Sequence, residues 1–437
     1  MRDPMSDPTG AARPPAAGDR GDRTATAHQG PRLLDGVRVL DLSRVLAGPW
    51  CGQLLADYGA DVIKVERPGS GDDTRAWGPP WWGEGTQRTA AYYLCANRGK
   101  RSIAIDIASA EGAAQVRQLA AEADVLLENY KVGQLARYGL DAASLQALNP
   151  RLVCCSITGY GQDGPLAEAA GYDFAIQATG GLMSLTGEAE GTPGSQPQKV
   201  GVAVTDLFTG VYAATAILAA LLERGRTGRG RHIDAALLDT QVAMLANQAA
   251  NARIGGLRPT RMGNAHPNIV PYQVFATADG HLVLAIGNDG QFARFCALAG
   301  RPEVAADPRF ARNADRVQHR AELVAQLSVW LRERTTADWC ALLEPNAVPC
   351  APILGVPEVF AHPQVKHRGL GVAIDGLPLV APPMCVDGAR PMALRSPPAL
   401  DADGPAIRAA LAAGQGWPAA PARPDAEKEA PDRPSGT

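Results

Sequence analysis

The 437-residue sequence lacks paired cysteine motifs, because none of its eight cysteines belongs to a CxxC pair. Cys154 and Cys155 are neighbours on a predicted strand, so their side chains point to opposite faces and suit neither a zinc site nor an ordinary disulfide. We therefore expect reduced thiols, no metal site and a cytoplasmic location, where disulfides are rare.

An excess of positive charge and long apolar runs are also missing. The formal net charge is −3, which excludes a general electrostatic attraction to nucleic acid or to an anionic membrane. No apolar run reaches the roughly 18 residues of a membrane-spanning helix, and the first thirty residues contain no apolar stretch typical of a secretory signal. Any anionic ligand must therefore be bound by local arginine and lysine side chains.

Several catalytic motifs are absent as well. The sequence contains no GxxxxGK[ST], HExxH or GxSxG, which removes the simplest NTPase, zinc-protease and hydrolase interpretations. Residues 159–164 do fit GxGxxG, but Pro165 follows directly and no acidic residue ends a strand about 20 positions later. We therefore do not expect a nicotinamide-binding site.

What the sequence does contain is an alternation of short apolar strands with helices, which predicts an α/β fold with a parallel sheet covered on both faces. The strands are expected at 37–42, 61–66, 102–107, 125–129 and 152–158. The predicted organisation is a disordered tail (1–30), a large Rossmann-like domain (31–225), a linker helix (226–260), a small α+β domain (261–369), a return to the first sheet (370–411) and a disordered tail (412–437).

Basic and aromatic residues gather at the ends of the predicted strands. Ligands of open parallel sheets bind at the carboxyl ends of strands, so these residues are expected to converge on a phosphorylated nucleotide with an adenine ring. The alternative is that each is an ordinary solvated charge. The residues are Arg44, Arg67, Asn97, Lys100, Arg101, Asn129, Tyr130 and Arg137.

Asp206 begins a predicted long apolar helix. It is interpreted either as an N-cap, for which Asp is well suited, or as a reactive carboxylate at a helix N-terminus. Tyr172-Asp173 precedes another helix and allows the same cap interpretation. The stretch 261–273 is either an ordinary loop or a flap whose backbone N–H groups bind an oxyanion.

Together these segments resemble the family III CoA-transferases, the CaiB/BaiF group that includes formyl-CoA transferase. The resemblance runs from about Leu33 to Leu400 and is nearest to the succinyl-CoA:glutarate type of dicarboxylate transferase. It rests on ordered stretches, among them LLDGVRVLDLSRVLAGP (33–49), NRGKRSIAIDI (97–107), SITGYGQDGP (156–165), VGVAVTDLFTG (200–210) and RMGNAHPNIVPYQ (261–273).

The resemblance implies roles for individual residues. The family's catalytic aspartate falls on Asp206, and its mobile glycine loop falls on Gly263, Asn264, Ala265 and His266. This loop is less rich in glycine than in formyl-CoA transferase, which argues against formate or oxalate as the substrate. CoA contacts are implied for Arg44, Leu46, Ala47, Arg67, Asn97, Lys100, Asn129, Tyr130, Arg137, Tyr172 and Asp173.

The implied chemistry transfers CoA from an acyl-CoA, succinyl-CoA by the nearest resemblance, to a carboxylic acid through an aspartyl-CoA intermediate. CoA thioesters are then substrates and no cofactor is tightly bound. The family also implies a homodimer of interlocked rings. Two alternatives stay open: an α-methylacyl-CoA racemase, in which a His pairs with the Asp where this chain has Tyr172, and a CoA-binding regulatory protein without turnover.

Overall fold

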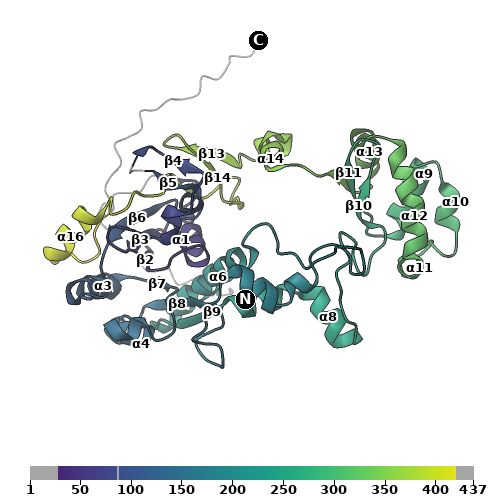
Figure 1. The fold of residues 1–437 in the computed structure, drawn as a ribbon. Coiled ribbons are helices and arrows are strands. Elements are labelled where there is room, and N and C mark those ends of the chain that lie inside the picture. Colours follow the sequence, from purple (N-terminus) through teal and green to yellow (C-terminus); the bar gives the residue numbers. More distant parts are fainter. Residues whose placement is uncertain (1–27, 86–87, 420–437) are drawn as a thin grey trace, which may run out of the picture.

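The computed structural model describes residues 28–85 and 88–419 (Figure 1). It has a large α/β domain, at the left in Figure 1, and a small domain at the right. The chain leaves the large domain through α8 (Ala246–Gly255) and returns past α14 (Val356–Ala361) to the large domain.

The large domain is built on one six-stranded sheet in which each neighbouring pair of strands is parallel. Most residues of its five N-terminal strands are buried, as expected for a sheet covered on both faces. The predicted parallel α/β core is confirmed. In spatial order the strands are β6 (Lys100–Ala104), β3 (Asp61–Glu66), β2 (Arg38–Asp41), β7 (Val125–Glu128), β8 (Val153–Thr158) and β9 (His232–Ala236).

Helices cover both faces of this sheet. Successive side chains of a strand point to opposite faces, so Leu40 and Cys154 join one apolar core while Val39 and Cys155 join the other. The adjacent cysteines thus lie on opposite faces, as predicted. The first core is covered by α3 (Ala110–Glu122), α4 (Ala142–Leu148) and α16 (Gly404–Ala412), the second by α1 (Ala47–Asp57) and α6 (Val204–Thr227).

The helix α6 is long and apolar enough to cross a membrane by length and composition alone. Asp206 and Glu223 interrupt its apolar run, which is why the sequence did not indicate such a helix. In the structure α6 packs along α1 and against β8 and β9. These contacts are those of a helix in the core of a folded domain.

The small domain packs helices against an antiparallel sheet of order β10-β11-β12. Its core is rich in aromatic side chains, and the rings of Phe295 and Trp330 stack with their centroids 6.5 Å apart. Its elements are β10 (Tyr272–Ala276), β11 (His281–Ala285), α9 (Asp289–Leu298), α10 (Pro302–Ala306), α11 (Asn313–Gln318), α12 (Arg320–Trp330), α13 (Thr336–Leu343) and β12 (Cys350–Pro352).

Two segments differ from the predicted boundaries. Residues 226–260 are not only a linker helix, because they contain the edge strand β9 before α7 (Leu237–Met244) and α8. Residues 370–411 add no strand to the six-stranded sheet. They form the hairpin of β13 (Gly371–Ile374) and β14 (Leu377–Val380), then β15 (Met392–Ala393), which pairs with β1 (His28–Gln29), and α16.

Both segments predicted to be disordered tails include residues that the structure describes as ordered. Gln29 pairs with Met392 in a two-stranded sheet. Beyond residue 411, Trp417 is buried, and its Nε1 donates a hydrogen bond to Asp61 Oδ2 at 2.8 Å. A large aromatic ring stabilises the folded state by leaving water, so the chain stays ordered up to this anchor. Residues 1–27 and 420–437 lie outside the described residues.

Buried charges fix the loop that follows β2. Lys64 Nζ lies 3.0 Å from Asp72 Oδ2 and donates to the carbonyl oxygen of Ser43 at 2.7 Å. Asp72 in turn accepts a hydrogen bond from the backbone N–H of Val45 at 3.2 Å. Both charged side chains are buried, and each is compensated by the other. The segment 43–46 is therefore tied to the sheet at two points.

The prediction that Lys100 and Arg101 precede the third strand is wrong, since β6 begins at Lys100. The Lys100 ammonium is fully buried and donates to Asp41 Oδ2 at 2.8 Å and to Asn97 Oδ1 at 2.9 Å. Arg101 pairs with Asp61 at 2.6 Å. These cations hold the strands together from within the domain.

Candidate active site

Asp206 is the third residue of α6, and the structure does not support the N-cap interpretation. The helix begins at Val204 with Ala203 as its N-cap residue, and no side chain of that residue caps the helix. The Asp206 carboxyl group therefore has no capping task.

Asp173 caps α6 from another helix. It is the first residue of α5 (Asp173–Thr179), and its Oδ1 accepts hydrogen bonds from the backbone N–H groups of Thr205 at 2.8 Å and Asp206 at 3.3 Å. Its Oδ2 accepts from Gln177 Nε2 at 2.6 Å. The predicted cap role of Asp173 is thus present, but for α6 and not for its own helix. The contact fixes where Asp206 lies.

The same arrangement changes the acidity of Asp206. Burial, and then the nearby negative charge of Asp173, raise the pKa of Asp206 from 3.8 to about 7. A carboxylate that is harder to ionise is also a stronger nucleophile once it is ionised. At neutral pH a substantial fraction of Asp206 is ionised and reactive.

Asp206 borders a cavity of about 230 Å³ at the carboxyl ends of β2, β7 and β8. These three strands are neighbours, so the cavity occupies the position where open parallel sheets bind ligands. The predicted site residues that line it are Arg44, Leu46, Ala47, Asn129, Tyr130, Tyr172 and Asp206.

A second cavity, of about 250 Å³, adjoins the first, because Arg44, Tyr130 and Gln134 line both. It also includes the exposed Arg67. The Arg44 guanidinium carbon lies 5.4 Å from the centroid of the Tyr130 ring. Two guanidinium groups beside an aromatic ring can bind phosphate groups and a flat heterocycle.

Of the three acidic residues of the second cavity, Asp106 is exposed, whereas the other two do not cancel this positive charge. Glu66 and Asp72 also line it. Asp72 is paired with Lys64 at 3.0 Å and Glu66 with Arg75 at 2.7 Å. Their charges are compensated inside the domain, whereas Arg67 faces solvent. The opening toward Arg67 therefore suits an anion.

Asn129 lines the first cavity, but its side chain is engaged by the backbone of Arg44. Its Oδ1 accepts from the Arg44 N–H at 2.9 Å and its Nδ2 donates to the Arg44 carbonyl oxygen at 2.7 Å. This pair of hydrogen bonds orients the Arg44 segment. Asn129 thus shapes the cavity wall.

Four predicted ligand positions line neither cavity, and one of them, Asp173, caps α6 instead. Asn97 and Lys100 are fully buried and bonded to each other, so they support the fold. Arg137 lies on the short 3-10 helix Leu135–Tyr138, is exposed, and is absent from both cavity walls. Spacing along the sequence could not distinguish these last three residues from Arg44 and Arg67, because all of them lie next to the ends of predicted strands.

The predicted substrate loop, Gly263 to His266, lines neither cavity within one chain. Arg320 Nη2 donates to the carbonyl oxygens of His266 at 2.8 Å and Pro267 at 2.9 Å, which ties the loop to α12. Burial and the Arg320 charge lower the pKa of His266. The same chain therefore does not bring this loop to Asp206.

Sequence reasoning missed Tyr92 and Gly210. Burial, followed by the charges of Asp206 and Asp173, raises the pKa of Tyr92 to about 12, which places its hydroxyl group in their field. A Cβ atom at Gly210 would lie 2.7 Å from the carbonyl oxygen of Ala47, so glycine lets α6 approach α1 closely, one turn after Asp206. Neither residue belongs to a catalytic motif, and only the packing identifies it.

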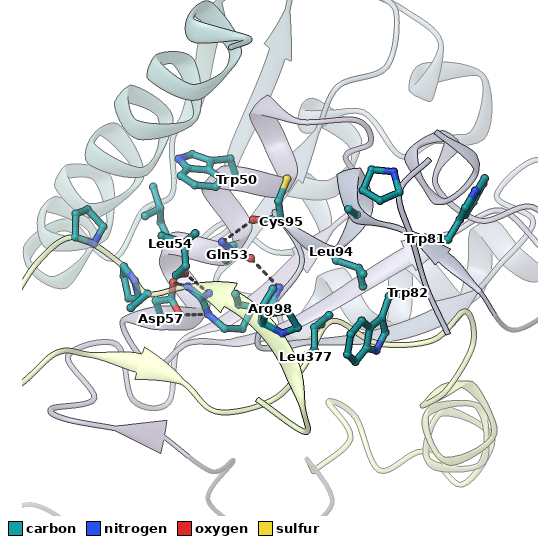
Figure 2. A pocket seen from close by; sticks show the side chains of 18 residues that line it. Trp50, Gln53, Leu54, Asp57, Trp81, Trp82, Leu94, Cys95, Arg98 and Leu377 are labelled. Carbon is teal, nitrogen blue, oxygen red and sulfur yellow. Dashed lines mark hydrogen bonds and ion pairs between the residues drawn. The ribbon is translucent and has the colours of Figure 1, made fainter. Parts of the chain in front are cut away.

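A larger cavity of about 530 Å³ lies outside this region, between α1, α2 (Ala91–Leu94) and the β13–β14 hairpin. Figure 2 shows its apolar lining, with Trp50, Trp81, Trp82 and Leu377 around it. Its charged members, Asp57 and Arg98, pair at 2.6 Å. Because its polar groups bond to one another, it suits an apolar surface better than a reaction.

Comparison with known proteins finds one family and several close relatives. The model of CoA-transferase family III matches residues 34–404. Succinate–glutarate CoA-transferase of Agrobacterium fabrum is 54% identical over 78% of this chain and 85% of its own length. Human succinyl-CoA:glutarate CoA-transferase is 48% identical over 77% of this chain and 75% of its own. A solved CAIB/BAIF family protein from Brucella suis is 50% identical, with a TM-score of 0.78 over 87% of this chain and 100% of its own.

The raised pKa of Asp206 predicts a pH-dependent effect of Asp206→Asn on stability. A carboxyl group whose pKa rises on folding destabilises the native state as pH increases from about 4 to about 7. Asn carries no charge, so the variant should gain stability relative to wild type across this window, by at most about 1.4 kcal/mol per pH unit. Urea unfolding at fixed protein concentration and several pH values measures the difference.

Asp239→Asn is the matched control for this measurement, since Asp239 also lies in the first turn of a helix but is exposed. Its stability difference from wild type should stay nearly constant with pH. A constant difference for Asp206→Asn as well would contradict the raised pKa.

Proposed function

We propose that this chain, which belongs to CoA-transferase family III, moves CoA from succinyl-CoA to a dicarboxylic acid such as glutarate, with Asp206 as the covalent carrier. Transfer of CoA between carboxylic acids is the activity of the chain as a member of this family. The observation that carries the assignment of Asp206 is its position: a carboxyl group with a pKa of about 7, without a capping role, at the wall of a cavity that also contains Arg44 and Tyr130.

The names of the relatives support the choice of acids. The Agrobacterium and human proteins, 54% and 48% identical to this chain, are named for succinate or succinyl-CoA and glutarate. CoA thioesters are then substrates, and the reaction requires no tightly bound cofactor. A cytoplasmic location stays a prediction that accords with these soluble metabolites.

The first half of the reaction moves CoA onto the protein. An Asp206 carboxylate oxygen attacks the thioester carbonyl carbon of the donor, the C–S bond breaks, and an acyl-aspartyl anhydride and a CoA thiolate form. The thiolate then attacks the aspartyl carbonyl carbon of the anhydride. This step gives an aspartyl-CoA thioester and releases the donor acid as its carboxylate.

The second half reverses these steps with the acceptor. The acceptor carboxylate attacks the aspartyl thioester, which gives a new anhydride and again a CoA thiolate. Attack of the thiolate on the acceptor's acyl carbon yields the product acyl-CoA and restores the Asp206 carboxylate. Water would hydrolyse either anhydride, so the half-buried position of Asp206 favours transfer over hydrolysis.

The two adjoining cavities provide a place for the long CoA substrate. The reactive sulfur would lie in the cavity of Asp206, and the nucleotide in the one that contains Arg67. Arg44 and Arg67 would bind phosphate groups, and Tyr130 would pack against adenine. Asn97 and Lys100 have no part in this arrangement, because both are buried in the fold.

We also propose a homodimer in which a second copy completes each site. The Gly263–His266 loop does not reach the Asp206 cavity within one chain, so the partner's loop would cover it. Apolar side chains of α6 are exposed on the single chain, with Phe208 at 45%, Val211 at 46% and Tyr212 at 51%. Together with the apolar cavity of Figure 2, they provide surface that a second copy can bury.

The covalent role of Asp206 predicts that Asp206→Asn and Asp206→Ser fold but lose transfer, by at least about 10³-fold or roughly 4 kcal/mol. Neither side chain can form the anhydride. Wild-type enzyme incubated with succinyl-CoA should be labelled at Asp206 by borohydride or hydroxylamine, as peptide mass spectrometry detects. Asp239→Asn should transfer normally.

Transfer above about one tenth of the wild-type rate in a stable Asp206→Asn enzyme, a barrier change under about 1.4 kcal/mol, would reject the carrier role.

A separate experiment identifies the acceptor acid: a panel of C3–C6 dicarboxylates and matched monocarboxylates is assayed with succinyl-CoA as the donor. Exchange of the α-proton of an acyl-CoA without transfer would instead indicate the racemase alternative.

The structure separates two basic residues by their expected defects. Arg67→Ala should raise the KM for succinyl-CoA by roughly 10- to 100-fold, the loss of about 1.5–3 kcal/mol for a charge-assisted bond, and leave stability unchanged. Lys100→Met should instead reduce the free energy of unfolding by about 3–5 kcal/mol, because it leaves Asp41 buried and unpaired. Steady-state kinetics and urea unfolding distinguish these two defects. A raised KM in Lys100→Met together with a loss of stability in Arg67→Ala would contradict this location of the nucleotide site.

The dimer proposal predicts a particle of twice the 45.7 kDa chain mass in light scattering. Because interlocked chains cannot separate without unfolding, the dimer should persist on dilution to nanomolar concentration. Monomers at micromolar concentration would contradict the interlocked arrangement.

A further inference from the structure

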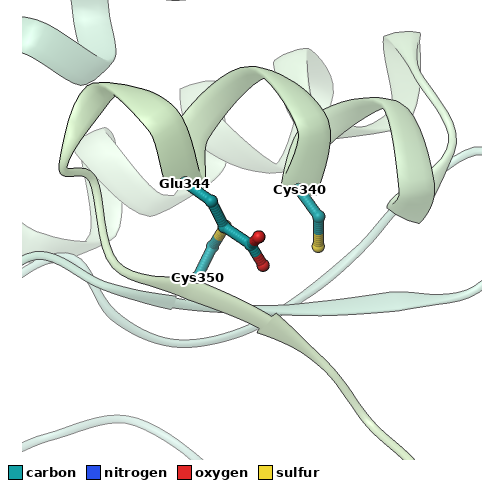
Figure 3. A group of neighbouring side chains, drawn as sticks. All are labelled: Cys340, Glu344 and Cys350. Carbon is teal, nitrogen blue, oxygen red and sulfur yellow. The ribbon is translucent and has the colours of Figure 1, made fainter. Parts of the chain in front are cut away.

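Two cysteines and a glutamate meet in the small domain, far in the fold from the Asp206 cavity. Cys340 lies on α13, Glu344 follows the end of that helix, and Cys350 begins β12 (Figure 3). Their sulfur and carboxylate oxygen atoms all lie within 4.8 Å of one another. Figure 3 shows the Cys340 side chain and the Glu344 carboxylate pointing from one side of the helix toward the strand.

The backbone around this cluster is fixed by its neighbours. Trp339 and Leu343 of the same helix are buried in the small-domain core, and Val348 in the connecting turn is fully buried. The turn is closed by a hydrogen bond from Val348 N to the Leu343 carbonyl oxygen at 3.1 Å, and β12 is paired with β11. The donor atoms are therefore held close together by the fold itself.

The donor set has the chemistry of a site for a soft divalent cation. Thiolates bind Zn²⁺ with a Zn–S distance of about 2.3 Å, which places two sulfurs of a tetrahedral site about 3.8 Å apart. The donor atoms of the cluster all lie within 4.8 Å of one another, which is compatible with that value. We propose that Cys340, Cys350 and Glu344 bind one Zn²⁺ ion, with a water molecule as the fourth ligand.

Binding of Zn²⁺ releases the protons of both thiols and leaves a small net charge on the site. Each thiol loses its proton to solvent, and two thiolates and one carboxylate coordinate the dication, which leaves a net charge of −1 on the site. The cysteines rest against the apolar core, whereas Glu344 is exposed and faces solvent. An ion can therefore enter from the Glu344 side and link α13 to the edge strand β12.

The Glu344 carboxylate favours a metal site over a pair of cysteines that forms a disulfide. A dithiol that forms a disulfide must first give a thiolate, and a neighbouring negative charge opposes this. The same carboxylate helps a metal site, because it supplies a third ligand and part of the compensating charge. The position of Glu344, one helical turn after Cys340, thus favours the cation.

No sequence motif indicates this site, and the proposal revises the expectation that the protein has no metal site. Cys340 and Cys350 are ten positions apart, not the spacing of a CxxC motif. The turn between α13 and β12 brings them together, and only the folded structure shows that turn.

The test is metal binding to the full-length protein, reduced and then freed of metal, with Zn²⁺ and Co²⁺ as probes. Dialysis should leave one Zn²⁺ per chain, and Co²⁺ should give thiolate-to-metal charge-transfer absorption. Cys340→Ser and Cys350→Ser should each weaken binding by more than about 100-fold, since even indirect partners of a metal cost 10- to 100-fold. Glu344→Gln should weaken it less.

Cys385→Ser is the matched control, since Cys385 is exposed and belongs to no such cluster among the described residues. It should bind like wild type, and circular dichroism should show all variants folded. A dissociation constant weaker than on the order of 100 μM, about −5.5 kcal/mol, or equal binding in all variants, would overturn the proposal. Loss of two free thiols to a Cys340–Cys350 disulfide in the presence of Zn²⁺ would overturn it as well.

Discussion

The buried pair of Lys64 and Asp72 holds the loop on which the whole site depends. Lys64 binds the Ser43 carbonyl oxygen and Asp72 the Val45 N–H, so the two charges bracket Arg44. Val45 has a φ of 71°, a conformation that a β-branched residue adopts only under strain of about 1–3 kcal/mol. The bonds on both sides offset that strain. Without them the loop would relax, and Arg44 would leave the wall shared by both cavities.

Asp173 couples the position of Asp206 to its acidity. Its carboxylate accepts two N–H groups at the start of α6, which stabilises the helix end. The same negative charge opposes ionisation of Asp206, whose own N–H is one of these two groups. A neutral capping residue would hold the helix but lack this effect. One side chain thus helps to set where the Asp206 carboxyl group lies and, after burial, how readily it ionises.

Much of this arrangement could be predicted from the sequence. Apolar strands alternating with helices indicated the parallel sheet, and residues after strand ends indicated Arg44, Tyr130 and the cavity between them. The sequence could not show which cations face solvent. Lys100 and Arg67 have the same type of charge near strand ends, but a long lysine side chain at the start of β6 reaches Asp41 inside the domain.

The partners of a helix end were equally hidden from sequence reasoning. Asp206 had the spacing of an N-cap, yet Asp173, 33 positions earlier, performs that task. Close packing of α1 and α6 at Gly210, and the cluster of Cys340 with Cys350, also depend on contacts between distant segments. Local patterns predict elements, whereas these features arise only when elements meet.

The return of the chain to its first domain has a consequence for synthesis. Trp417 contacts Asp61, and α16 covers the core formed by the first strands, so the large domain cannot be complete until the chain has left the ribosome as far as Trp417. The small domain, a continuous segment, can fold earlier. During that interval one apolar face of the nascent sheet lacks its last helix, and exposed strands of this kind associate with other chains. The protein is therefore most prone to aggregate in the interval of its synthesis that precedes the emergence of α16.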